Sequence, residues 1–167
     1  MAYKFLGTEY DKTELLPILK HNIDFLVETQ KMTIQNLIEL KENLEKVVDV
    51  FRNNGFSETE EEKALREKMQ LETKEKSQTA LAQFTEKRQN ACVEFDSFVS
   101  SVERDIIAAK HSDTVVENLI KMIDDYISNK KFSLLLAAIN GIDNYSQNPN
   151  YAHCYDCYIS AFNRFAD

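Results

Sequence analysis

A heptad pattern of apolar residues in the first third of the chain limits what the chain can fold into. The spacing alternates between four and three residues without a slip, and eight of the ten positions are apolar. A period of 3.5 residues is typical of a helix that packs along its length on another helix, and it differs from the two-residue period of a strand. The pattern therefore predicts a long amphipathic helix. The ten positions are Leu19, Ile23, Leu26, Gln30, Thr33, Leu37, Leu40, Leu44, Val47 and Phe51.

This first helix is expected over residues 11–54. Asp11 and Glu14 have the spacing of a capping box at its start. At its end, Asn53-Asn54-Gly55 is a typical stop signal, because glycine adopts the left-handed conformation that closes many helices. Roughly forty residues at 1.5 Å each make a rod of about 60 Å. Residues 1–10, which precede the helix, are expected to form an extended arm.

A second long helix is expected over residues 57–111. Ser57 and Glu60 repeat the capping-box spacing, and no Gly or Pro interrupts the chain from Ser57 to Asn140. The turn between the two helices spans only a few residues, so they should lie antiparallel as a coiled-coil-like hairpin. Residues 72–79 are strongly polar, and the sequence leaves open whether the helix continues through them.

Three shorter helices are expected to follow, at residues 114–128, 132–146 and 151–165. Each has an apolar face at helical spacing, and polar turn residues separate them. Three Gly and two Pro in 167 residues leave few turns, which argues against a β-rich fold. We therefore predict a single all-α domain. It is a helical bundle in which the three short helices pack at the base of the hairpin, beside Leu16–Leu26 and Phe95–Ile106.

The charge pattern limits the class of partner. The chain carries 20 Lys and Arg against 28 Asp and Glu, which gives a net charge of −8, and no basic face is visible. Binding to nucleic acid and bending of anionic membranes both use such a face, so neither is expected. The sequence instead favours a soluble, acidic protein whose partner is another protein.

Hydropathy and cysteine content indicate the cellular compartment in which the protein is expected. The longest apolar run, Leu134–Ile139, is far too short to span a bilayer, so no membrane insertion is expected. Met1–Gly7 contains no apolar run of signal-peptide length. The three cysteines fit reduced thiols better than a disulfide scaffold. These features predict a cytoplasmic protein, although secretion by a route that uses no cleavable signal would leave no trace in them.

One cluster has the residue types of a metal site. His153, Cys154 and Cys157 are close in sequence, and the two cysteines have the i, i+3 spacing that places them on one helix face. A structural zinc site needs about four ligands, and the usual second ligand pair is missing. No metal or cofactor is therefore expected. A metal- or thiol-dependent regulator built on this cluster is kept as an alternative function.

No catalytic motif stands out. His111, Ser112 and Asp113 are the residue types of a hydrolytic triad, but sequence neighbours cannot adopt triad geometry. Three isolated glycines do not make a phosphate-binding loop. We therefore expect a protein that is not an enzyme.

The first helix carries a second apolar stripe that a two-stranded coiled coil would leave uncovered. The stripe consists of Leu16, Val27, Ile34, Ile38 and Val48. The heptad pattern also turns polar near its middle, as does the facing part of the second helix. Both features favour a surface that binds a partner. The predicted partner-binding residues are Gln30, Thr33, Ile34, Ile38, Val48, Lys76 and Thr79.

The function expected first is therefore a non-enzymatic protein-binding module, of the adaptor, accessory or effector kind, with its partner along the hairpin. A second hypothesis is a structural coiled-coil homodimer whose two hairpins form a four-helix bundle. The last helix leaves a further question open. Tyr151, Tyr155 and Tyr158 could form part of the core or a tyrosine-rich recognition face.

Overall fold

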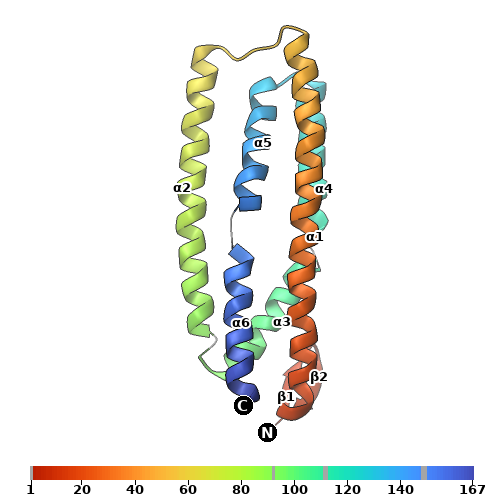
Figure 1. The fold of residues 1–167 in the computed structure, drawn as a ribbon, viewed down its shortest axis with the longest axis vertical. Helices are drawn as coiled ribbons and strands as arrows, with labels where there is room; N and C mark the ends of the chain where they lie inside the picture. Colours follow the sequence, from red (N-terminus) through yellow and green to blue (C-terminus); the bar gives the residue numbers. More distant parts are fainter. Residues whose placement is uncertain (1, 92, 111–112, 148–149) are drawn as a thin grey trace. The chain divides into compact units, whose positions relative to one another are not determined.

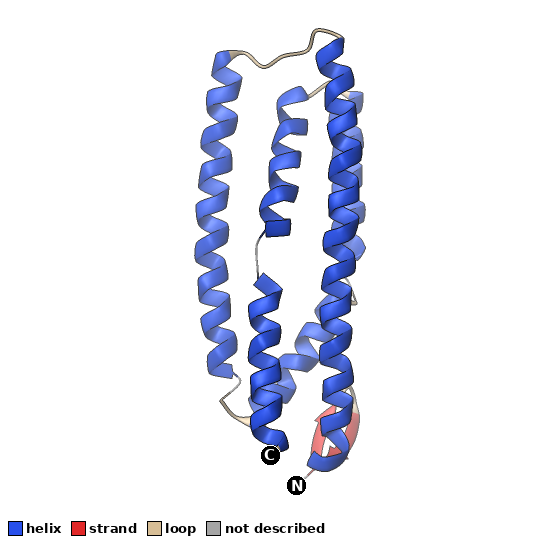
Figure 2. Ribbon diagram, viewed as in Figure 1, coloured by secondary structure: helices blue, strands red, loops and turns tan. Residues whose placement is uncertain are grey.

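The computed structural model describes residues 2–91, 93–110, 113–147 and 150–167. Helices account for most of these residues, and the strands among them form one two-stranded sheet (Figures 1 and 2). The predicted all-α class is confirmed. In the described ranges, no helix combines the length and the apolar character needed to cross a membrane. The elements in chain order are β1 (Ala2–Phe5), β2 (Thr8–Asp11), α1 (Lys12–Asn53), α2 (Glu60–Ala91), α3 (Phe95–Ala109), α4 (Asp113–Ser128), α5 (Phe132–Gln147) and α6 (Asn150–Ala166).

The chain divides into two compact units. The first unit contains Met1–Met32, Ala80–Ser112 and Pro149–Asp167, and the second contains Thr33–Thr79 and Asp113–Asn148. Helices α1 and α2 each contribute one part to each unit. Each unit has its own cluster of buried apolar residues.

The expected N-terminal arm is a β-hairpin over residues 2–11. β1 pairs antiparallel with β2, and Phe5 lies opposite Thr8. Leu6 and Gly7 make the two-residue turn with φ values of 49° and 87°, and a type I′ turn requires positive φ at both positions. The sequence alternation here is too short to separate a strand from a loop. The deciding contact is tertiary, because Phe5 is buried in the core of the first unit.

Helix α1 ends in a Schellman motif. Gly55 has a φ of 86° and donates its N–H to the carbonyl of Arg52 at 3.0 Å, and Phe56 donates to the carbonyl of Phe51 at 3.0 Å. The rings of Phe51 and Phe56 meet edge to face with centroids 5.0 Å apart, which is the apolar contact that accompanies this motif. The glycine thus ends the helix by adopting a conformation that strains other residues.

In place of the single helix expected over 57–111, the structure has two helices, α2 and α3. Helix α2 continues through residues 72–79 and ends at Ala91, and α3 begins at Phe95. Glu94 between them is extended, with φ −112° and ψ 148°. The break has no Gly or Pro to mark it. Its physical reason is burial: α3 buries an apolar face in the first core, whereas α2 is mostly exposed, and the break lets each helix orient independently.

The core of the first unit is built by α1, α3 and α6, together with Phe5 of β1. Helix α6 contributes two buried tyrosines. The hydroxyl of Tyr155 donates to the carbonyl of Leu26 at 2.9 Å, and Tyr158 is fully buried. These two tyrosines are therefore core residues. The side chain of Tyr151 lies outside the described residues.

The core of the second unit joins α1, α4 and α5. Leu44 and Val48 of α1 pack with Ile123 of α4 and with Phe132 and Leu135 of α5. The expectation that all three short helices pack at the base of the hairpin is therefore wrong, because α4 and α5 cover the last part of α1. Several helices of this chain have similar apolar stripes, so the stripe on α1 does not identify the helix that packs on it.

The coiled-coil pairing of α1 with α2 is not confirmed. In the second unit, α5 lies between these two helices (Figure 1). Lys41 of α1 forms an ion pair with Asp143 of α5 at 2.5 Å, and Ser133 of α5 donates to the carboxylate of Glu62 of α2 at 3.0 Å. The heptad face of α1 packs on the short helices that complete the two cores.

Candidate functional site

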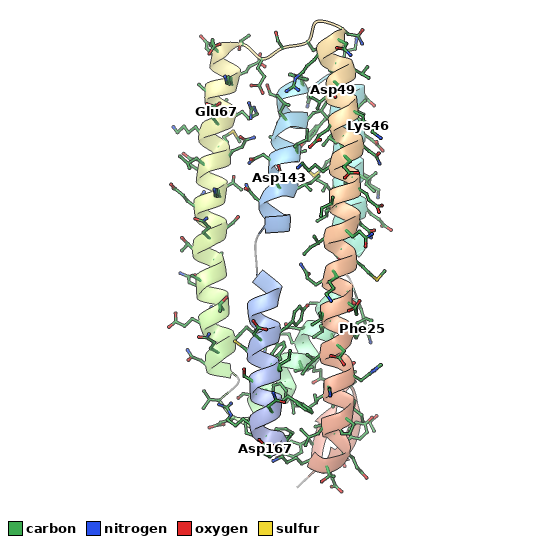
Figure 3. All side chains as sticks on the ribbon, in the orientation of Figure 1. Phe25, Lys46, Asp49, Glu67, Asp143 and Asp167 are labelled. Carbon is green, nitrogen blue, oxygen red and sulfur yellow. The ribbon has the colours of Figure 1, made fainter. Side chains whose placement is uncertain are left out.

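A groove runs between α2 and α5 in the second unit. Its volume is about 250 Å³, and its lining extends from Glu62 to Thr73 on α2 and from Ser133 to Asn144 on α5. Figure 3 shows the side chains of these helices and labels Asp143 on α5. Asp143 is not part of the described lining, and it pairs with α1. One face of α5 thus packs on α1, while another face forms a wall of the groove.

Helical spacing explains how the sequence forms the groove. On α5, Ser133, Ala137 and Gly141 recur every four residues, and residues four apart lie above one another on a helix. Their small side chains leave space between the helices: a Cβ added to Gly141 would meet no atom within 4 Å. On α2, Leu65 and Met69 have the same spacing and form the facing wall.

The groove has an apolar wall that is open to solvent. Leu65 and Met69 are 61% and 56% exposed, and Leu134 on α5 is 39% exposed. A hairpin of α1 on α2 would cover these side chains of α2. Leu44 and Phe51 of α1 pack instead in the core formed with α4 and α5. The apolar residues of α2 are therefore left at the surface.

A chain of hydrogen bonds leads into the groove along α2. The guanidinium of Arg66 donates twice to the carboxylate of Glu58, at 2.5 Å and 3.2 Å, and once to the side-chain oxygen of Gln70, at 3.1 Å. The side-chain nitrogen of Gln70 is buried and has no hydrogen-bond partner in the described structure. A buried donor without an acceptor costs about 1–3 kcal/mol. The chain thus ends in a donor that is buried in the wall of the groove.

A second polar cluster lies in the first unit and ties three helices together. Arg88 of α2 and Tyr158 of α6 both donate to the carboxylate of Asp105 on α3. Burial raises the pKa of the Asp105 carboxyl, and the hydrogen bond from Tyr158 and the charge of Arg88 oppose that rise. Because all three groups satisfy one another inside the unit, the cluster is best explained as a structural one.

Comparison of the chain with protein-family models, with curated proteins and with solved structures gave no match. The function is therefore inferred from the chain itself. The groove combines an open apolar wall with polar side chains along its lining, and small-molecule and peptide sites have this combination in common.

Two of the seven residues predicted to bind a partner are buried. Val48 is 2% exposed and packs in the core with Ile123 and Leu135, and Thr33 is also buried. The placement of Val48 on a free surface is therefore wrong. A two-stranded coiled coil buries a single seam of α1, so the sequence predicted that the second apolar stripe, which contains Val48, would be uncovered. In the structure, α4 and α5 cover this part of α1.

The other five predicted residues differ in exposure. Gln30 and Ile34 are half-buried, and Ile38, Lys76 and Thr79 are exposed. The described lining of the groove includes none of the seven predicted residues, so the groove was not predicted from the sequence. The four-residue spacing of small residues in α5 is the signal that could have indicated it.

The proposed metal cluster falls largely outside the described side chains. Those of His153 and Cys154 are not described, as is also true of His111 and Ser112. Cys157 is half-buried in the first unit, and burial raises the pKa of its thiol. Among the described residues, no group of three or more His, Cys, Asp and Glu side chains could hold a metal ion.

Proposed function

We propose that this protein is a non-enzymatic protein-binding module and that the groove between α2 and α5 is its binding site. The observation that carries the proposal is the open apolar wall, where Leu65, Met69 and Leu134 keep much of their side-chain surface in solvent. Exposed apolar surface at a concave site is typical of interaction sites. A partner that covers this wall removes apolar surface from water, at a gain of roughly 25 cal/mol per Å².

The polar groups of the groove favour binding over catalysis. Arg66 is held by Glu58, and Glu62 accepts a hydrogen bond from Ser133. These charged groups are engaged with the chain itself, so they define the rim of a binding site. The amide of Gln70 is also held within the chain, because its oxygen accepts from Arg66 and its nitrogen is buried.

This proposal keeps the class of function that the sequence favours and moves the binding surface from α1 to the groove. The alternative of a coiled-coil homodimer rested on the heptad seam of α1. Leu19, Leu37 and Leu44 of that seam are buried, and Leu19 and Leu44 belong to the two cores of the chain itself. A homodimer that uses the seam would have to open both cores.

Photo-crosslinking in the cells that make the protein tests the proposal. A Leu134→p-benzoylphenylalanine variant places the reactive group at the groove. A Met122→p-benzoylphenylalanine variant is the matched control, because Met122 is comparably exposed on α4 of the same unit and lies outside the described lining. We expect a discrete protein adduct at position 134 that is absent at position 122. Failure to form an adduct at 134, or the same adducts at both positions, would contradict the proposal.

A further inference from the structure

We infer that residues 60–74 of α2 form a strap that opens away from α5, so that the groove is the closed form of a wider site. The motion belongs to the chain by itself and does not depend on the proposed function. Three observations carry the inference: the strap buries none of its side chains, one described hydrogen bond joins it to α5, and the chain can bend at each of its ends.

The strap is weakly packed. Residues 60–79 lie wholly in the second unit, and their side chains are exposed, except that Arg66 and Gln70 are half-buried. The described core of this unit contains residues of α1, α4 and α5 and none of α2. Most of the stability of a helix in a protein comes from packing of an apolar face, and a helix of this length is marginal by itself. The strap should therefore open before the rest of the unit does.

The strap also has few polar contacts with the rest of the unit. Among the described residues, one hydrogen bond, from Ser133 to the carboxylate of Glu62, joins it to α5, and this bond is exposed to water. The guanidinium of Arg66 instead donates to Glu58 and Gln70, which lie directly before the strap and within it. The bonds of Arg66 can therefore persist when the strap moves.

The closed position of the strap has a cost at Gln70. This residue lines the groove together with residues of α5, and its side-chain nitrogen is buried without a hydrogen-bond partner in the described structure. A buried donor without an acceptor destabilises the state that buries it. Movement away from α5 lets water reach this side of the strap, so the amide of Gln70 favours the open state.

The first pivot of the strap lies at Ser57. Phe56 packs against the core of the second unit, whereas Glu58 is paired with Arg66 of the strap at 2.5 Å. Ser57, between them, is exposed and lies outside the helices. The chain can therefore change direction at Ser57 while both contacts are kept.

The second pivot lies at Glu75–Thr79. The hydroxyl of Thr79 donates to the carbonyl of Glu75 at 3.1 Å. Such a bond from Thr to the carbonyl four residues earlier slightly destabilises a helix and often bends it. Every residue over 71–79 is exposed, so side-chain packing does little to keep the helix straight there. The strap therefore lies between two points at which the chain can bend.

Proteolysis of the native chain tests the strap. A protease cleaves within a helix only when that helix opens locally, so an exposed lysine in a stable helix is resistant. Lys68 of the strap and Lys46 of α1 form a matched pair, because both are exposed lysines in helices of the second unit. At low concentrations of trypsin, we expect the initial rate of cleavage after Lys68 to exceed that after Lys46 by at least about a hundredfold. Equal rates would overturn the inference.

The dependence on urea separates opening of the strap from unfolding of the whole chain. Local opening exposes little surface, so cleavage after Lys68 should change little with urea below the global transition, whereas cleavage after Lys46 should rise steeply. A dependence at Lys68 as steep as that at Lys46 would contradict the inference.

Two variants test the physical causes of opening. Thr79→Val removes the hydroxyl and keeps the branched shape, and Gln70→Met replaces the amide by an apolar side chain of similar length. We expect each variant to slow cleavage after Lys68 by about three- to tenfold and to leave the rate at Lys46 unchanged. Faster cleavage in both variants would show that these side chains hold the strap closed, which is the opposite of the inference.

The strap and the proposed function can fail separately. A crosslink at position 134 together with equal cleavage of the two lysines would overturn the strap and leave the proposed function standing. Rapid cleavage of the strap without a crosslink at position 134 would overturn the proposed function and leave the strap standing.

Discussion

Arg88 of α2 contacts the carboxylate of Asp105 of α3, within the first unit. The contact holds the end of one helix against the next across the break that follows Ala91. Arg88 is 7% exposed, so the pair is largely shielded from water. Tyr158 of α6 donates to the same carboxylate. One acidic side chain therefore links three helices, and it does so where the sequence predicted an uninterrupted rod.

Removal of one partner of this pair should destabilise the first unit. In an Arg88→Met variant, Asp105 loses its cation while it stays largely buried, and breaking a buried pair in this way costs about 3–5 kcal/mol. We expect a loss near the lower end of that range, because the side chain of Asp105 is 20% exposed. Chemical denaturation measures the change in the free energy of unfolding.

The double variant Arg88→Met with Asp105→Leu is the control for this prediction. It removes both charges, so it should be more stable than Arg88→Met alone. If the losses of the two single variants simply add in the double variant, the two side chains are not coupled and the prediction is wrong.

The stability of the first unit should also depend on pH through Asp105. Burial is the largest cause that raises the pKa of this carboxyl above its ordinary value of 3.8, so the folded chain binds this proton more tightly than the unfolded chain does. The stabilisation from this group is complete below that value and is lost as the pH rises through the folded-state pKa. Asp105→Asn removes the titration. We expect the free energy of unfolding of the wild type to fall relative to that of the variant between about pH 4 and pH 7. A relative rise over that interval would contradict the prediction.

The turn of the β-hairpin stores backbone strain at Leu6. Its φ of 49° lies in the left-handed region, which costs a residue such as Leu about 1–2 kcal/mol. Its side chain is partly exposed, and its N–H donates to the carboxylate of Glu103 at 2.8 Å, a contact that any residue can make. Leu6→Asn should therefore raise the free energy of unfolding by about 1 kcal/mol.

Leu6→Ala distinguishes this backbone effect from a loss of side-chain packing. Alanine keeps the left-handed strain, so its thermal midpoint should not rise. An equal rise for both variants would show that the exposed side chain, and not the backbone, limits stability.

The space above Gly141 predicts a stabilising substitution. Glycine inside a helix is less stable than alanine by about 0.5–1 kcal/mol. A Cβ at this position meets no neighbour within 4 Å. Gly141→Ala should therefore raise the free energy of unfolding by that amount, as measured by thermal unfolding. Ala137→Gly, one turn earlier on the same wall, should lower the free energy of unfolding by a similar amount. A destabilised Gly141→Ala variant would mean that the groove is closed by atoms near this residue.

The helical class and the buried face of α1 could be predicted from the sequence. Leu19, Leu26 and Leu44 are buried as the heptad pattern indicates. These properties are local: the side-chain period and the backbone preference of single residues decide them before distant parts of the chain meet.

The partners of that face could not be predicted, and neither could the groove. An apolar stripe indicates that a face is buried, but it does not indicate which helix covers that face. The helix expected beside Leu44 was α2, whereas α5 packs there in the structure. The break after Ala91 follows from the burial of α3, and no nearby Gly or Pro indicates it in the sequence. The small residues at Ala137 and Gly141 form a groove because α2 stands beside them. By itself, the sequence determined which segments are helical and which faces are apolar, whereas the tertiary structure decided which faces meet and which apolar side chains are left in solvent, because packing depends on residues that are far apart in the chain.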